Sequence, residues 1–389
     1  MKRTIRYSLL LIWMVAIACG VSAQSVSFDF RPNYVLPTHA VLRTGENKKL
    51  DNEFYAFHLK YAFQFRPDSY LGALYPNTRQ GIGVAYNAFF NNSVGNPVAV
   101  YAFQSARIAR ISRQLSLNYE WNFGASFGWN PYDELLNPDN EIIGSKINAY
   151  INLGIMLDWQ LSKSWTFTGG VGFSHFSNGN THYPNAGLNS VEARVGVVRK
   201  FASSGSAQND CCVATAQWGE QPHFSYDIVV YGATRKQLIL KERYIIPGSF
   251  GIVGMNISPM YNFNKYLRAG VSLDAQYDES ANLKNHIAGY DEEGKLRFYR
   301  PPLKEQLTFG LSVRGELVMP VFSINFGMGY NLYSHGDDFK GLYQILALKT
   351  HLTRNFYLHT GYQLSKFRTP KNLMLGVGYR IHGRRSKRE

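Results

Sequence analysis

The sequence predicts an all-β protein, an antiparallel transmembrane β-barrel chain in two repeated halves of about eight strands each. Three observations predict this fold. Aromatic residues make up 15% of the chain and charged residues only 17%. Residues 146–159 alternate between an apolar face and a mostly polar face, as a strand between lipid and a polar lumen would. Beyond the N-terminus, no apolar run reaches the roughly 20 residues that a membrane-spanning helix needs. A secreted array of β-sandwiches is the alternative.

The first 23 residues have the composition of a secretory signal peptide. A basic start precedes an apolar run over residues 9–18, and Val-Ser-Ala stands before Gln24 as a small-residue cleavage site. We therefore expect residues 1–23 to be removed on export through the inner membrane. Cys19 permits a lipoprotein signal instead, but the residues before it fit that cleavage less well.

Strands are expected throughout the mature first half, and their connections alternate in length. Tight turns at 112–114 and 162–164 alternate with long polar loops such as 130–144. Outer-membrane barrels have short periplasmic turns and longer outer loops, although the segment 67–80 is longer than this rule expects. The expected strands lie near residues 25–35, 53–66, 81–90, 97–110, 114–129, 146–161, 164–178 and 189–201.

The second half of the chain repeats the pattern of the first. NFGASFGW, ending at Trp129, resembles NFGMGYNL, ending at Leu332, and the strands after residue 222 again count to about eight. Residues 203–221 are polar and rich in small residues, which predicts a linker. We expect a first barrel half at 24–202 and a second at 222–389. They form either two small barrels or one wide barrel of about 14–16 strands.

Two polar residues interrupt the apolar face of the strand that ends near residue 178. His175 and Ser177 share that face with Phe173, because side chains alternate along a strand. Asn189, on the next strand, has the matching parity, whereas Glu192 has the opposite parity and is expected in the lumen. An imidazole can take the proton of a serine hydroxyl, and an asparagine carbonyl can orient that imidazole. The pattern predicts a serine hydrolase with Ser177 as nucleophile, His175 as general base and Asn189 orienting His175.

The residues after Ser177 complete the expected site. Asn178 and the backbone amides around Gly179 are the expected oxyanion hole. In the register that aligns the two halves, Leu364 and Lys366 replace the imidazole and the hydroxyl. The second half is therefore expected to lack catalytic residues.

The segment HFSNGNTHYPNAGLN resembles the active-site segment of the lipid A 3-O-deacylase family, which consists of eight-stranded outer-membrane barrels. The family's His-x-Ser-Asn motif is followed by Pro-Asn-x-Gly, here Pro184, Asn185 and Gly187. The resemblance implies base, nucleophile and oxyanion roles for the residues of the first motif. It also implies an outer-leaflet substrate, lipid A or lipopolysaccharide. The family usually has a glutamate where this chain has Asn189.

A second resemblance is to outer-membrane phospholipase A, which carries His-x-Ser-Asn-Gly and an asparagine at the position of Asn189. That family forms twelve-stranded, calcium-dependent dimers. The primary expectation is therefore an outer-membrane esterase that removes an ester-linked acyl chain from lipid A without a cofactor. The alternatives are a phospholipase A, with calcium as its metal, and a non-enzymatic pore or binding barrel. The oligomeric state is left open.

Other features of the sequence give weaker indications of function. The net charge of +14 suits anionic lipid headgroups, and no nucleic-acid motif accompanies it. The only mature cysteines, the adjacent Cys211 and Cys212, lack the spacing of a metal site. We expect no catalytic role for His182. A cation at Asp133 and Glu134, or a lipid phosphate at Lys48 and Lys49, is a weaker candidate in the outer loops.

Overall fold

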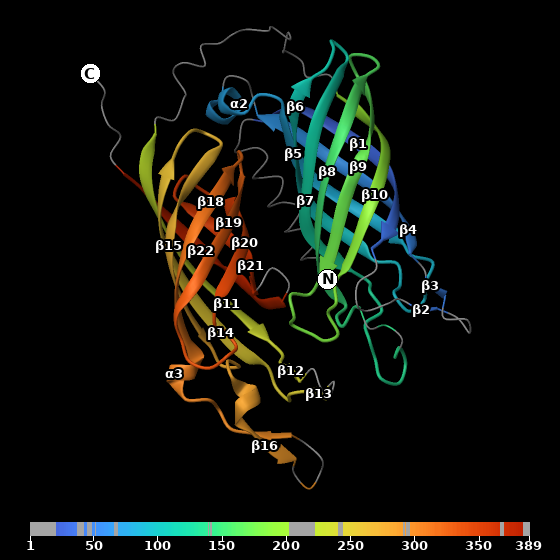
Figure 1. Ribbon diagram of the computed structural model, residues 1–389. Helices are drawn as coiled ribbons and strands as arrows, with labels where there is room; N and C mark the ends of the chain where they lie inside the picture. Colours follow the sequence, from blue (N-terminus) through green and yellow to red (C-terminus); the bar gives the residue numbers. More distant parts are fainter. Residues whose placement is uncertain are drawn as a thin grey trace, which may run out of the picture. The chain divides into compact units, whose positions relative to one another are not determined.

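Strands dominate the computed structural model and close into two barrels (Figure 1). The chain divides into two compact units, each containing one barrel, so of the two arrangements left open the chain adopts two small barrels. The expected all-β fold in repeated halves is confirmed. The structure describes residues 21–36, 43–44, 49–50, 52–65, 69–138, 140, 142–201, 222–239, 244–290, 292, 296–365 and 369–383.

The first barrel closes through antiparallel pairs in the order β1-β10-β9-β8-β7-β6-β5-β4, and β1 also pairs with β4. The expected strands agree with the observed ones to within a few residues. A short helix, α2 (Tyr70–Leu74), occupies the unusually long segment 67–80. The barrel strands are β1 (Val21–Val35), β4 (Glu53–Phe65), β5 (Thr78–Ala88), β6 (Val98–Arg110), β7 (Leu115–Phe127), β8 (Ile147–Gln160), β9 (Trp165–Ser177) and β10 (Leu188–Lys200), with a small hairpin of β2 (Arg43–Thr44) and β3 (Lys49–Leu50).

The second barrel has the order β11-β14-β15-β18-β19-β20-β21-β22, and β11 pairs with both β14 and β22. Its strands are β11 (His223–Arg235), β14 (Phe250–Asn262), β15 (Leu267–Asp278), β18 (Leu307–Val318), β19 (Phe322–Ser334), β20 (Leu342–His351), β21 (Phe356–Ser365) and β22 (Thr369–His382). Its loops carry two small hairpins, β12 (Leu238–Ile239) with β13 (Tyr244–Ile245) and β16 (Ile287–Tyr290) with β17 (Leu296–Phe298), and two short helices, η2 (Leu283–His286) and α3 (Leu303–Gln306).

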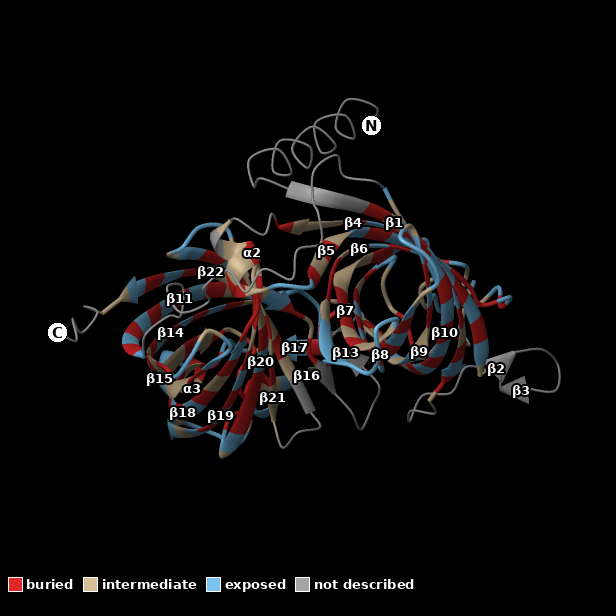
Figure 2. Ribbon diagram, turned by 90° about the horizontal axis from the view of Figure 1, so that it is seen from above, coloured by how far each residue is buried: buried red, intermediate tan, exposed pale blue. Residues whose placement is uncertain are grey.

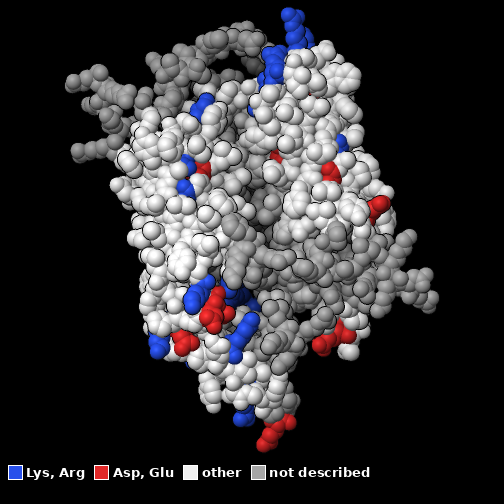
Figure 3. All heavy atoms as spheres, in the orientation of Figure 1, with Lys and Arg blue, Asp and Glu red and all other residues white. Residues whose placement is uncertain are grey.

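Alternation along the strands gives each barrel an apolar outside and a polar inside. In Figure 2 buried and exposed residues alternate along the strands of both barrels. The exposed positions are mostly large and apolar, for example Leu153, Ile155 and Val171. Charged side chains are sparse over the strands on the face shown in Figure 3. An apolar outer belt around a polar interior is the pattern of a barrel that spans a membrane. No helix among the described residues is long and apolar enough to cross a membrane.

An ion-pair network fills the lumen of the first barrel. Arg31, which is fully buried, lies 2.9 Å from Asp29, 3.1 Å from Glu120 and 2.8 Å from Glu192. Lys60 lies 2.8 Å from Glu120. Such buried charges are tolerated because each has partners of opposite sign at hydrogen-bonding distance. The lumen of this barrel is therefore a packed polar core.

The second lumen contains a separate network of the same kind. Lys349 lies 2.7 Å from Asp227, and Arg380 lies 2.6 Å from Asp227 and 2.9 Å from Glu316. All four side chains are at most 3% exposed. Both barrels are thus filled by side chains, as expected for barrels of this strand number.

Several expectations fall outside the described residues. Residues 1–20 of the expected signal peptide are not described, and Val21–Ala23 are described only as backbone at the start of β1. The expected linker 203–221, with Cys211 and Cys212, lies outside as well, as do Lys48 and Lys366. Lys49 is described only as backbone, in β3.

Candidate active site

Strands β9 and β10 bring the expected catalytic residues together at one end of the first barrel. β8 and β9 are joined by the tight turn 161–164, so β9 runs from the short-turn end towards the long loops. Barrel convention makes that far end the outer one. His175 pairs directly with Asn189 across the β9–β10 ladder, and Ser177 follows two residues later on the same face. Their partly exposed side chains interrupt the apolar outer surface, as the parity of the sequence predicts.

The three side chains form a continuous hydrogen-bonded chain. His175 Nδ1 lies 2.7 Å from Asn189 Oδ1, and His175 Nε2 lies 2.9 Å from Ser177 Oγ. Asparagine Oδ1 is an acceptor, so the Nδ1 nitrogen carries the proton and Nε2 is free to accept from the serine hydroxyl. This tautomer is the one that a general base next to a serine nucleophile requires.

The side chain of Glu192 points into the lumen, away from the hydrogen-bonded chain of Ser177, His175 and Asn189. Its carboxylate faces the lumen, accepts a hydrogen bond from Arg31 at 2.8 Å, and accepts others from Asn152 at 3.0 Å and Ser174 at 3.1 Å. The opposite parity of Glu192 and Asn189 on β10 therefore leaves the asparagine as the group beside His175.

The loop after Ser177 holds the expected oxyanion residues in a tight turn. The backbone N–H of Asn178 donates to Asn185 Oδ1 at 3.1 Å, a bond that the sequence did not suggest. Gly179 has φ 67° and Asn180 has φ 66°, both in the left-handed region. A substrate oxyanion at this N–H would have to share or replace the oxygen of Asn185.

Gly187 lies against the imidazole. Its φ is 71°, and a Cβ atom at this position would lie 3.1 Å from His175 Cε1. A side chain would therefore press on the ring and would also strain the backbone. Together with Pro184 and Asn185, this glycine shapes the return of the chain into β10.

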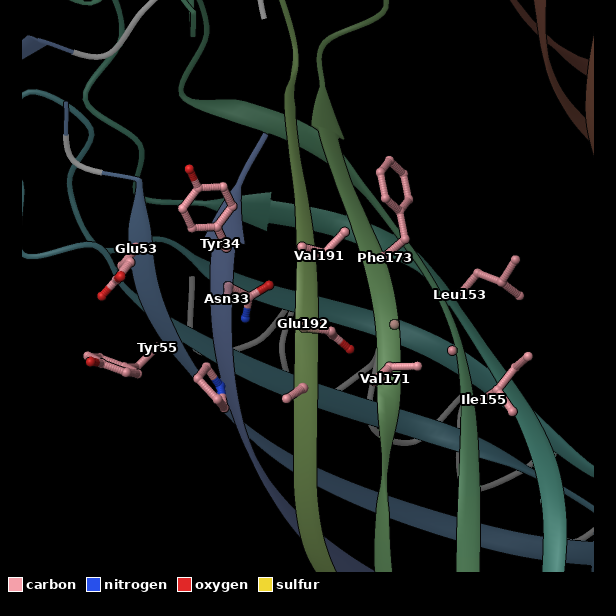
Figure 4. Close-up of a pocket in the computed structure, with 14 residues that line it drawn as sticks. Asn33, Tyr34, Glu53, Tyr55, Leu153, Ile155, Val171, Phe173, Val191 and Glu192 are labelled. Atoms are coloured by element: carbon pink, nitrogen blue, oxygen red, sulfur yellow. The ribbon is translucent and has the colours of Figure 1, made fainter. Parts of the chain in front are cut away.

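A shallow groove of about 760 Å³ runs over the outer face of the barrel next to these residues (Figure 4). Phe173 and Val191 form the next outward-facing register pair after His175 and Asn189, two residues along the strands. Gly154 and Gly172 are paired on adjacent strands in the groove, and their Cβ positions face the lumen, where a Cβ at Gly172 would lie 2.8 Å from Glu192 Oε1. The apolar outward side chains that line it include Leu153, Ile155, Val171, Phe173, Val191 and Ala193.

Two family models match the chain, one over each barrel. The model of lipid A 3-O-deacylase, PagL, matches residues 55–198. The model of the acyloxyacyl hydrolase C-terminal domain matches residues 224–383. The chain belongs to the lipid A 3-O-deacylase family. This deacylase is an outer-membrane ester hydrolase that removes an ester-linked acyl chain from lipid A, and the family match does not support the phospholipase alternative.

Solved structures similar to this deacylase include a surface protein and an outer-membrane channel. Neisserial surface protein A is 12% identical, with 47% of this chain and 99% of that chain covered and a TM-score of 0.30. An outer-membrane channel from Pseudomonas putida F1 is 9% identical, with 93% and 96% covered and a TM-score of 0.19. No curated protein matches the sequence.

Other polar residues in the loops of the deacylase stand apart from the hydrogen-bonded chain. His182 is exposed, and its Nδ1 lies 3.3 Å from Thr181 Oγ1. Asp133 accepts the backbone N–H groups of Leu135 and Leu136, each at 2.9 Å. These two bonds lower the pKa of the Asp133 carboxyl below its usual value. No group of three or more His, Cys, Asp or Glu side chains in the described part of the chain is arranged to hold a metal ion.

Sequence reasoning missed the groove and the loop contacts around the site. The groove spans residues from β1, β4, β8, β9 and β10, and only the closure of the barrel brings β1 and β4 beside β10. The bond from Asn178 to Asn185 has no signature in strand periodicity.

Proposed function

We propose that this deacylase works through a Ser177–His175–Asn189 triad that faces the lipid of the outer leaflet. The observation that carries the proposal is the unbroken chain of hydrogen bonds, 2.9 Å from Ser177 Oγ to His175 and 2.7 Å from His175 to Asn189. It lies on the apolar outer face of the barrel, where an acylated lipid can approach directly. Polar side chains on a lipid-facing surface are energetically costly, so their presence there favours a functional role.

The reaction would proceed through an acyl-enzyme. Ser177 Oγ attacks the ester carbonyl carbon while its proton passes to His175 Nε2. The tetrahedral intermediate collapses, the bond to the sugar oxygen breaks, and His175 returns the proton to that oxygen. A water molecule then attacks the acyl-serine ester with His175 again as base, which releases the fatty acid and restores the serine. Proton transfer by a positioned histidine contributes typically about 10²–10⁴-fold to such a reaction.

Asn189 orients the base without adding a negative charge. Its carbonyl oxygen holds the Nδ1–H tautomer of His175 but gives the transient imidazolium less stabilisation than a carboxylate would. We propose that the Asn178 backbone N–H donates to the developing oxyanion. The oxyanion then competes with Asn185 Oδ1 for this N–H. Gly179, in the same turn, would let the backbone approach the substrate closely.

The groove gives this reaction a place for the acyl chain. Its first register pair, Phe173 and Val191, is two residues from His175 and Asn189 along the strands, a distance of about 7 Å. An acyl chain lying there would place its ester carbonyl beside Ser177. On β21, the strand of the second barrel that aligns with β9, the outward positions Thr360, Tyr362 and Leu364 carry no imidazole, so this strand would not supply a base.

A fluorophosphonate probe tests the triad directly. The purified protein in detergent micelles is treated with the probe, and the labelled peptide is mapped by mass spectrometry. We expect the label on Ser177 and expect labelling to be at least about 100-fold slower in His175→Ala, because the base activates the hydroxyl. Ser174→Ala is the matched control, since Ser174 lies on the same strand but faces the lumen. Labelling elsewhere, or rates independent of His175, would refute the triad.

A further inference from the structure

A buried apolar cluster at the outer end of the first barrel supports the catalytic residues from inside. Phe176 lies between His175 and Ser177 in the sequence but points inward and is fully buried. Leu188, just before Asn189, is 1% exposed. Both belong to one cluster with Trp129 and Ile143. The outer ends of β9 and β10 are therefore held by Phe176 and Leu188, which share this cluster with residues of the loop between β7 and β8.

Asn140 organises that loop. It is fully buried, and its Nδ2 donates to Ser93 O at 3.0 Å and to Asn130 O at 2.7 Å. Its Oδ1 accepts the backbone N–H groups of Ile142 at 3.1 Å and Ile143 at 3.0 Å. One side chain thus joins three segments of backbone, and its removal would take away the Oδ1 acceptor of the Ile142 and Ile143 N–H groups.

The contacts continue from Ile143 into the loop of the active site. Ile143 forms an antiparallel bridge with Asn185, and Asn185 Oδ1 accepts the Asn178 backbone N–H at 3.1 Å. Asn178 directly follows the nucleophile. A short path therefore leads from Asn140 through Ile143 and Asn185 to the backbone beside Ser177.

We propose that Asn140 is a positioning residue for ester hydrolysis. Its Oδ1 fixes the backbone at Ile143, and that backbone fixes the Asn185–Asn178 turn on which the oxyanion forms. This inference rests on the proposed triad, because it assigns the turn after Ser177 to the transition state. It assigns Asn140 no contact with the substrate, which binds on the opposite, outward face of the strands.

The neighbouring Asn137 provides a matched control. Its Nδ2 donates to the same two carbonyl oxygens, Ser93 O at 2.9 Å and Asn130 O at 3.2 Å, and also to Pro131 O at 3.0 Å. Its backbone pairs with Asp133 in both directions and its carbonyl oxygen accepts the Asn140 N–H at 3.4 Å, bonds that an alanine at this position keeps and that do not involve Ile143. Asn137→Ala therefore weakens the same loop without loosening the path to the active site.

The experiment compares Asn140→Ala, Asn140→Asp and Asn137→Ala in the full-length protein, with purified lipid A in mixed micelles as substrate. The folded fraction is read from heat modifiability on gels. We expect Asn140→Ala to lower kcat by about 10-fold to 100-fold at nearly constant KM, since a displacement of about 1 Å can cost 10²-fold. Asn137→Ala should stay within about twofold of the wild type, because the catalytic turn keeps its anchor.

Asn140→Asp keeps the acceptor for Ile142 and Ile143 but loses both donors, so its folded fraction should retain more kcat than that of Asn140→Ala. The inference is overturned if Asn140→Ala keeps wild-type kcat in its folded fraction, or if Asn137→Ala loses as much. Ser177→Ala in the same assay separates the two proposals. Activity in Ser177→Ala would refute the triad itself, whereas an inactive Ser177→Ala beside an active Asn140→Ala refutes only the role of Asn140.

Discussion

Removal of the group that orients the base is the most informative perturbation of the triad. Asn189→Leu replaces the amide by an apolar side chain of similar size and deletes the 2.7 Å bond to His175 Nδ1. The ring then loses both its fixed tautomer and its orientation. An unpaired, partly buried N–H costs about 1–3 kcal/mol, and each 1.36 kcal/mol is a factor of ten in rate. We therefore expect kcat to fall by about 5-fold to 150-fold with KM nearly unchanged.

The assay is steady-state release of fatty acid from lipid A in mixed micelles. Ser190→Ala is the control, because Ser190 is the next residue on β10 but faces inward, where its hydroxyl donates to Asn33 Oδ1 at 2.9 Å. It should keep the wild-type kcat. If Asn189→Leu retained kcat within about twofold, or if both variants lost activity equally, the bond to Asn189 would not contribute to catalysis.

Three further predictions follow from the fold and the groove. Gly187→Ala should inactivate a protein that still folds, because the new Cβ would lie 3.1 Å from His175 Cε1; wild-type turnover in folded Gly187→Ala would contradict this contact. Arg31→Ala should destabilise the first barrel by about 3–5 kcal/mol in a urea titration in detergent, since buried Glu192 loses the cation that it pairs with; an unchanged midpoint would mean that the network is not stabilising. Val171→Trp should raise KM for long acyl chains more than for short ones by filling the groove, and equal effects on both would place the chain elsewhere.

The sequence predicted the barrels and the grouping of His175, Ser177 and Asn189 because both depend on the same alternation. Period two along β9 placed His175 and Ser177 on one face, and parity on β10 selected Asn189 over Glu192. The structure has the three selected side chains in hydrogen-bonding order. The choice between two barrels and one wide barrel could not be made in this way, because closure depends on which strand β1 meets.

The surroundings of the site were beyond sequence reasoning for a similar reason. Asn140 and Asn185 act through backbone groups of loops whose conformations leave no periodic pattern. The groove depends on barrel closure, which brings β1 and β4 from the start of the barrel beside β10 at its end. Strand faces are local properties of the sequence, whereas the loop turn and the groove are properties of the closed barrel.

The central claim is that Ser177 removes an acyl chain from lipid A, and the most direct measurement is mass spectrometry of the lipids of cells that make the wild type or Ser177→Ala. Both proteins must be folded in the outer membrane, as read by heat modifiability. The account predicts lipid A lighter by one ester-linked acyl chain with the wild type and unmodified lipid A with Ser177→Ala. Identical lipid A in the two strains, or the appearance of lysophospholipid in place of shortened lipid A, would contradict it.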